Sequence, residues 1–221
     1  MKLIIFDIDG TLVDSRDIIL QCFSKAFDEL GLPQLDEERV LSIVGLSLPQ
    51  ACQELVGDDA AQALVRYYQE NFIRISTQME KTGPKLFAGI AELIEKLSAL
   101  PDIMLGLATG NSFRGVNRLL DAYNWHEHFV TIQTADNAPS KPHPAMLLQA
   151  MEECGTEKPD TIMIGDTSFD IDMAVVAGIP SIGVVWGNHT KERLIQAHAS
   201  HIAHDSAELS ALLSSFSAQA I

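Results

Sequence analysis

The sequence has few cysteines, little positive charge and no long apolar run. Its three cysteines, Cys22, Cys52 and Cys154, are scattered without CxxC spacing, which favours free thiols in a reducing compartment over disulfides or a zinc site. Fifteen basic side chains against thirty acidic ones give a net charge of −15, and such a surface repels nucleic acid and anionic lipid. No apolar run approaches the roughly 18 residues of a membrane span, and Asp7 and Asp9 interrupt the N-terminal apolar stretch too early for a signal peptide. These absences predict a cytoplasmic protein that binds neither nucleic acid nor membrane.

What the sequence does contain is an alternation of strand-like and helical patterns. Its 221 residues, 47% hydrophobic and 20% charged, suffice for one ample core or for a core with a modest insertion. Strands are predicted at residues 2–6, 103–108, 129–133, 161–164 and 181–186, with a short apolar segment at 201–203. Helices are predicted at residues 89–100, 112–123, 144–154, 169–177 and 207–216. This alternation predicts an α/β fold with a doubly wound, mostly parallel, Rossmann-like sheet.

A purely helical stretch separates the first strand from the second. Helical patterns cover residues 17–30, 36–44, 48–56 and 60–79, with glycines between them. About seventy residues are far more than a strand-to-helix crossover needs. We therefore expect an α-helical cap domain at residues 15–84, inserted into an α/β core domain of residues 1–14 and 85–221.

Polar side chains follow the predicted strands where they end. Because ligands of doubly wound sheets bind outside the carboxyl ends of the strands, these side chains are expected to converge on one edge. Each of them alone could be an ordinary turn or helix cap. Several carboxylates together are tolerable only around a divalent cation, and oxygen ligands favour Mg²⁺. In chain order the polar groups are Asp7, Asp9, Thr109, Gly110, Asn111, Lys141, Asp166 and Asp170.

In this order the motifs resemble those of the haloacid dehalogenase superfamily of aspartyl-phosphate phosphatases. They are DIDGTLVDS at residues 7–15, Thr109, KPHP at residues 141–144, and Gly165-Asp166 with Asp170. Their spacing and the helical insertion are similar to the phosphoglycolate phosphatase subfamily, in which a small helical cap follows the first motif. The resemblance covers essentially the whole chain.

The resemblance implies a role for each of these residues. Asp7 would be the nucleophile and Asp9 the general acid and base, while Thr109 and Lys141 would bind the phosphoryl group. Mg²⁺ would be held by Asp7, the backbone carbonyl of Asp9, and Asp166, with Asp170 orienting the site. Gly110 and Asn111 would complete the phosphate site. Gly45 would lie in a substrate loop or else end a helix.

The function predicted from these roles is Mg²⁺-dependent hydrolysis of a small phosphorylated metabolite. Phosphoglycolate is the first expectation, with pyrophosphate, sugar phosphates and nucleotides as alternatives. A β-phosphoglucomutase-like phosphotransferase would share every catalytic residue. A response-regulator receiver, a signalling module without enzymatic turnover, also combines Asp, Thr, Lys and Mg²⁺, but it is shorter and lacks DxDGT and the insertion. The protein is expected to be a monomer or a small homo-oligomer.

Two further sets of residues lie outside these motifs. Arg16, Arg39 and Arg114 are candidates for binding a second anionic group of the substrate, although each could be a solvated charge. His189 is expected at the surface.

Overall fold

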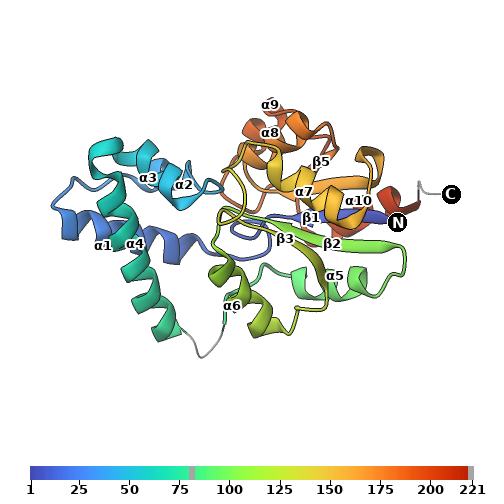
Figure 1. Cartoon of the computed structure of the whole chain (residues 1–221), viewed down its shortest axis with the longest axis horizontal. Helices are drawn as coiled ribbons and strands as arrows, with labels where there is room; N and C mark the ends of the chain where they lie inside the picture. The colour runs from blue at the N-terminus through green and yellow to red at the C-terminus, as the bar shows by residue number, and fades with distance from the viewer. Residues whose placement is uncertain (80–82, 219–221) are drawn as a thin grey trace.

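A six-stranded parallel sheet forms the larger part of the molecule (Figure 1). The computed structural model describes residues 1–79 and 83–218. The strands follow the spatial order β3-β2-β1-β4-β5-β6, and every neighbouring pair is parallel. They are β1 (Lys2–Phe6), β2 (Ile103–Ala108), β3 (Phe129–Gln133), β4 (Thr161–Gly165), β5 (Ser181–Val184) and β6 (His201–Ala203). The predicted fold class is confirmed.

Helices cover both faces of the sheet, which is why its central strands are apolar on both sides. On one face, Ile4 and Phe6 of β1 pack in a cluster with α5 (Ile90–Ser98), α6 (Phe113–Tyr123) and α10 (Ser206–Ala218). On the other face, Leu3 and Ile5 pack against α7 (Ala145–Cys154) and α8 (Ser168–Ala177). The alternation of the two sets follows from the two-residue period of a strand.

Several elements differ from the sequence-based expectation, α9 (Lys191–Gln196) and β5 among them. Helix α9, which begins after the capping residue Thr190, was not predicted, because six residues are too few to show a clear helical period. Strand β5 ends at Val184 instead of residue 186. There the chain leaves the sheet, and the Trp186 indole N–H donates to the Thr11 carbonyl at 3.1 Å.

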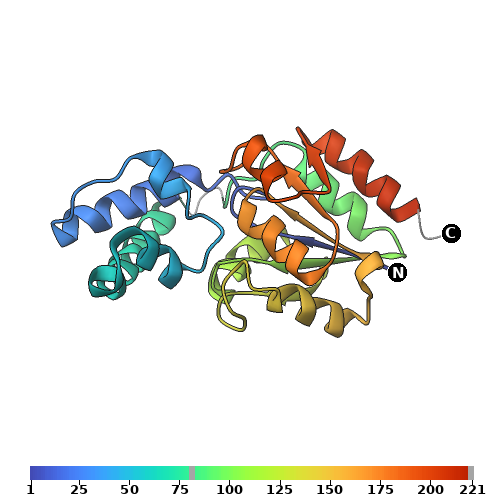
Figure 2. The same ribbon diagram turned by 90° about the horizontal axis from the view of Figure 1, so that it is seen from above.

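Between β1 and α5 lies the helical insertion, a name used here for α1–α4. Its helices are α1 (Arg16–Leu30), α2 (Glu37–Leu41), α3 (Leu48–Val56) and α4 (Asp58–Met79), and they share a separate apolar cluster. Figures 1 and 2 show the insertion beyond the carboxyl ends of the strands. Within the described residues, no helix combines the length and apolarity that a membrane span requires.

The chain enters and leaves the insertion through two paired segments. Asp14 N donates to the Lys85 carbonyl at 2.8 Å, and Phe87 N donates to the Leu12 carbonyl at 3.0 Å. The Lys85 ammonium also lies 2.6 Å from Asp14 Oδ2. We propose this paired connection as the boundary between a cap domain of residues 15–84 and a core domain of residues 1–14 and 85–221.

Candidate active site

The carboxyl ends of β1 and β4 bring three acidic side chains together. Phe6 lies in register with Ile164 of β4, so the residues that follow these strands, Asp7 and Asp166, emerge at the same edge. Asp170 joins them from the first turn of α8. Each of the three carboxylates offers an oxygen within 4.8 Å of the others, and all three side chains are buried.

Lys141 supplies the positive charge inside this cluster. Its ammonium lies 2.7 Å from Asp7 Oδ1 and 2.6 Å from Asp170 Oδ1, and it is fully buried. Burial alone would lower the pKa of Lys141, but the charges of Asp170 and Asp7 outweigh it and raise the pKa above its ordinary value. The lysine therefore stays protonated between the two carboxylates.

Asp7 is the carboxylate of the cluster that has the fewest partners. Its one close polar partner is the Lys141 ammonium, 2.7 Å from Oδ1, and within the described residues its Oδ2 accepts no hydrogen bond. Burial raises the pKa of Asp7 well above its ordinary range, and Asp170 and Asp166 add to this effect while Lys141 opposes it. A buried carboxylate oxygen without a donor is costly, so this geometry suits a ligand that brings positive charge to Asp7 Oδ2.

Asp166 is held by groups from three separate segments. Its Oδ1 accepts from the Thr11 hydroxyl at 3.1 Å, and its Oδ2 accepts from Asn188 N at 2.7 Å and from Asn188 Nδ2 at 2.9 Å. Burial, followed by the charge of Asp170, raises the pKa of Asp166 to about 7. Sequence reasoning missed Asn188, although its position after β5 at the same edge could have indicated it.

The conformation and the surroundings of Gly10 explain why the DxDG motif requires glycine. Its φ is +84°, a conformation that side chains with a Cβ rarely adopt. A Cβ at this position would lie 2.1 Å from Asp166 Oδ2. The backbone therefore passes directly beside the Asp166 carboxylate.

Asp170 is occupied by neighbouring donors. Its Oδ1 accepts from Lys141, and its Oδ2 accepts from Thr167 N at 3.1 Å and from the Thr167 hydroxyl at 2.7 Å. The contact with Thr167 N is part of a capping box at the start of α8. Asp170 thus fixes Lys141 and the helix terminus at once.

Asp9 lies on the cavity side of the cluster and is partly exposed. Its Oδ2 accepts from the Asn111 side-chain amide at 2.6 Å. Burial raises the pKa of Asp9 above its ordinary value, against the opposing effects of the Lys141 charge and the Asn111 hydrogen bond. Asn111 N in turn donates to the Thr109 hydroxyl at 3.2 Å, which links the two residues.

Residues 42–47 of the insertion lie against the sheet edge. The segment is held there by Ser47 N, which donates to the Ser140 hydroxyl at 2.8 Å. Gly45 has φ +101°, and a Cβ there would lie 2.8 Å from the Thr167 hydroxyl. Gly110 approaches the same segment, because its Cβ would lie 2.4 Å from the Leu46 carbonyl oxygen. Since α2 ends at Leu41, Gly45 does not end a helix.

The expectation that His189 is exposed is wrong. This side chain is buried, and its Nδ1 accepts from Ser168 N at 2.9 Å. Nδ1 therefore carries no proton, and Nε2 donates to the Ser42 carbonyl of the insertion at 3.3 Å. Burial lowers the pKa of His189 to about 4, so the ring stays neutral.

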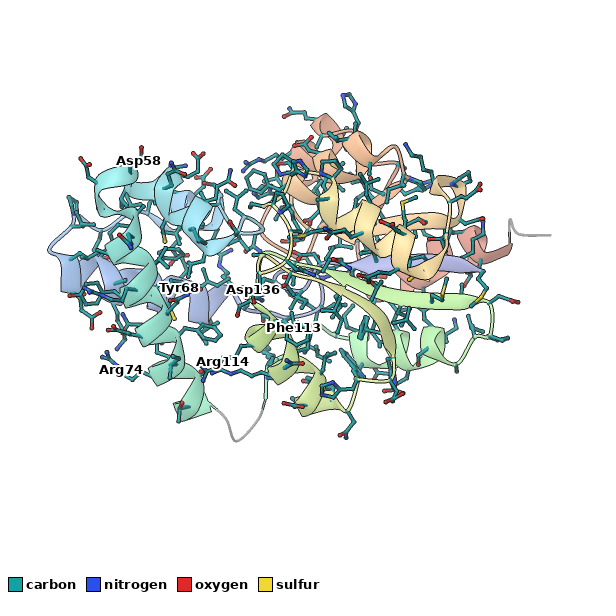
Figure 3. The ribbon with its side chains drawn as sticks, in the orientation of Figure 1. Asp58, Tyr68, Arg74, Phe113, Arg114 and Asp136 are labelled. Carbon is teal, nitrogen blue, oxygen red and sulfur yellow. The ribbon has the colours of Figure 1, made fainter. Side chains whose placement is uncertain are left out.

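A cavity of about 440 Å³ opens between the sheet edge and the insertion. Figure 3 shows two of its lining residues on facing parts of the molecule, Tyr68 on α4 and Asp136 beyond β3. The sheet region contributes Asp7, Asp9, Thr109, Gly110 and Asn111, and the insertion contributes a largely apolar wall that includes Ile19, Phe23, Gly45, Tyr68 and Phe72.

Residues 4–184 match the family of haloacid dehalogenase-like hydrolases. The chain belongs to this family. It is 37% identical to a probable phosphatase, IndB, of Dickeya dadantii over 198 residues, covering 87% of this chain and 84% of that protein. It is 31% identical to the phosphoglycolate phosphatase of Escherichia coli over 210 residues, covering 86% of this chain and 83% of that protein. A structure of a haloacid dehalogenase-like family hydrolase from Streptococcus pneumoniae superposes with a TM-score of 0.84 at 27% identity, covering 96% of this chain and 98% of the other.

The family and these relatives identify the chain as a phosphoric monoester hydrolase. A receiver module without turnover is excluded, because both the family match and the helical insertion belong to hydrolases of this type. The buried oxygen-only cluster of Asp7, Asp166 and Asp170 is compatible with a divalent cation such as Mg²⁺.

Proposed function

We propose that this hydrolase removes phosphate from a small phosphomonoester similar to phosphoglycolate, with Asp7 as the nucleophile. The observation that supports this role is the state of the Asp7 carboxylate. Asp166 and Asp170 have both oxygens engaged by donors, whereas Asp7 has Lys141 beside its Oδ1 but no donor for its Oδ2 among the described residues, and it borders the cavity. A carboxylate with free lone pairs at a cavity wall is the one able to attack phosphorus.

The residues present fit a Mg²⁺ ion. Asp7, Asp166 and the Asp9 carbonyl would hold it, and within the described residues that carbonyl accepts no hydrogen bond. When bound, Mg²⁺ would offset the charge of the carboxylates and polarise a phosphoryl oxygen. Asp170 would act indirectly, because its contacts with Lys141 and Thr167 fix the position of the lysine.

In the first step, an Asp7 oxygen forms a bond to phosphorus while the bond from phosphorus to the ester oxygen breaks. The departing alkoxide takes a proton from Asp9, whose raised pKa favours the protonated form and whose carboxyl is oriented by Asn111. Lys141 and the Thr109 hydroxyl stabilise charge on the phosphoryl oxygens. The Gly110 backbone N–H would donate beside them, and Asn111, whose N–H donates to the Thr109 hydroxyl, would help to orient that hydroxyl.

In the second step, the Asp9 carboxylate takes a proton from water, which then attacks the aspartyl-phosphate and releases phosphate. The insertion forms one wall of the cavity and would reduce the access of bulk water to the site. Gly45 and its neighbours border the cavity beside Gly110 and Thr167, so they would contact the part of the substrate beyond the phosphate. The relatives named phosphoglycolate phosphatase make phosphoglycolate the first substrate to try.

Asp9→Asn tests the mechanism, because it removes the acid and base but keeps the backbone carbonyl. Removal of one general acid and base should lower turnover about 10²–10⁴-fold. The loss should be smaller for p-nitrophenyl phosphate than for an alkyl phosphate, because nitrophenolate leaves without a proton. The phosphoenzyme on Asp7 should accumulate and be visible by mass spectrometry.

Two control variants make the result specific. Asp7→Asn should show neither turnover nor phosphoenzyme. Asp14→Asn, the same chemical change at a residue paired with Lys85 outside the cluster, should retain wild-type turnover. Equal losses on both substrates without trapped phosphoenzyme would contradict the role of Asp9. Product analysis with glucose 1-phosphate separates phosphate release from the transfer expected of a mutase.

A further inference from the structure

The catalytic cavity carries two arginines that the proposed chemistry does not use. Arg114 and Arg118 both line it from α6, and they are its only positively charged lining residues among those described. They lie four residues apart, so they share one helix face and their charges repel each other. In a chain of net charge −15, two cations kept beside a cavity indicate that an anion is recognised there.

Of these two, Arg114 has the freer guanidinium. Within residues 1–79 and 83–218 it makes no ion pair and no side-chain hydrogen bond. Figure 3 shows its side chain reaching from α6 toward α4 of the insertion. Asp136 lines the same cavity, but its Oδ2 accepts from Phe113 N at 2.7 Å and belongs to the start of α6.

Arg118 is held in place on the cavity wall. Its Nη1 donates to the Ser76 hydroxyl at 3.2 Å, and its guanidinium carbon lies 5.5 Å from the centre of the Phe72 ring. Both partners belong to α4, so this arginine joins the sheet region to the insertion while its charge stays at the cavity. Arg118 therefore holds a positive charge in a fixed position beside any group that Arg114 binds.

The other two arginine candidates do not face the cavity. The Arg16 guanidinium lies 3.1 Å from Glu37 Oε2, and Arg39 donates to the Glu54 carbonyl. Neither side chain lines the cavity.

We propose that Arg114, assisted by Arg118, binds a second anionic group of the substrate, so that the enzyme selects phosphomonoesters that carry a further carboxylate or phosphate. The inference rests on the proposed function, in which the reacting phosphoryl group lies at Asp7. A guanidinium presents two parallel N–H donors to either kind of oxyanion, and such charge-assisted pairs are stronger than neutral hydrogen bonds. The apolar wall from Phe23 and Phe72 would contact the carbon chain between the two anionic groups.

Matched substrates test this selection. We would measure kcat/KM for phosphoglycolate and its three- and four-carbon homologues, each paired with the alkyl phosphate of equal length, and for propane-1,3-diol bisphosphate. Wild type should prefer the doubly anionic member of at least one pair. Arg114→Gln should lower kcat/KM for that member by about 10–100-fold, mostly through KM, because it removes a charged hydrogen-bonding partner. Alkyl phosphates should change less than about twofold, and Arg114→Lys should restore part of the loss.

Arg16→Gln is the control, because this arginine is paired outside the cavity and should affect no substrate. The carboxylates and the bisphosphate distinguish which anionic group is recognised. Equal losses of Arg114→Gln on charged and neutral substrates, or no loss on either, would overturn the inference. Wild-type turnover of alkyl phosphates without any preference would overturn it too, while leaving the proposed function intact. Absence of turnover on every phosphate would overturn both.

Discussion

The helical insertion and the edge of the sheet bury opposite kinds of side chain. The cluster of the insertion is apolar, with Phe27 and Leu64 at its centre. The sheet edge instead buries four charged groups, which are Asp7, Lys141, Asp166 and Asp170. Apolar burial stabilises a fold roughly in proportion to its area, whereas buried charges cost free energy unless they are paired. Burial therefore stabilises the insertion, whereas the buried charges of the sheet edge cost free energy and are explained by a catalytic role.

The two regions can also be observed separately. Both tryptophans, Trp125 and Trp186, lie in the sheet region, so their fluorescence reports on that region alone. Cys22 and Cys52 are both buried in the insertion, Cys52 within its apolar cluster, and burial raises the pKa of each thiol to about 12. Their reaction with a thiol reagent therefore reports opening of the insertion.

The largest effect on stability is expected when the buried charge network loses the positive charge of Lys141. Lys141→Met leaves Asp7 and Asp170 buried beside each other, and it should lower the free energy of unfolding of the sheet region by about 3–5 kcal/mol. The measurement is denaturation in chelator, followed by tryptophan fluorescence. Lys85→Met is the control, because this exposed lysine pairs with Asp14 at the surface and should change stability by less than about 1 kcal/mol. Similar losses for both variants would show that the buried network contributes no more to the free energy of unfolding than a surface ion pair does.

A cavity in the insertion should act differently and stay local. Leu64→Ala removes a fully buried side chain and should cost about 2–5 kcal/mol of insertion stability. Labelling of Cys22 and Cys52 should then speed up by about 30-fold or more, while the tryptophan transition hardly moves. Ile73→Ala is the matched control on the same helix, because that side chain is 44% exposed. If the tryptophan denaturation midpoint fell together with the increase in thiol labelling, the two regions would not unfold separately.

The smallest of the three effects is that of the metal. Mg²⁺ at about 100 times its Kd should stabilise the folded sheet region by about 2.7 kcal/mol, because it binds the folded state alone. The denaturation midpoint followed by tryptophan fluorescence should rise accordingly, and the rate of thiol labelling should stay unchanged. Asp166→Asn should remove the effect, whereas Asp121→Asn, at an exposed carboxylate outside the cluster, should keep it. Equal stabilisation of both variants at matched ionic strength would place the ion elsewhere.

Sequence reasoning succeeded where neighbouring residues carry the signal. The strands β1, β2 and β3 have the predicted bounds, because each is a short, mainly apolar segment followed by polar residues. The helical insertion could be predicted from its helical patterns together with its length. Helix α9 and the burial of His189 were missed, because a short helix has little periodicity and a histidine shows nothing of its surroundings in the sequence.

The sequence by itself determined the order of the four motifs and the placement of Asp7 and Asp9 on one side of a strand end, because these depend on residues a few positions apart. Only the tertiary structure decided which partners complete the site. Asn188 reaches Asp166 across 22 residues, Asn111 reaches Asp9 across 102, and residues 42–47 meet Ser140 and Thr167 from another part of the fold. Arg114 lines the cavity while Arg16 and Arg39 do not. Such choices follow from how helices pack over the sheet edge, and local periodicity carries no information about contacts between segments so far apart in the chain.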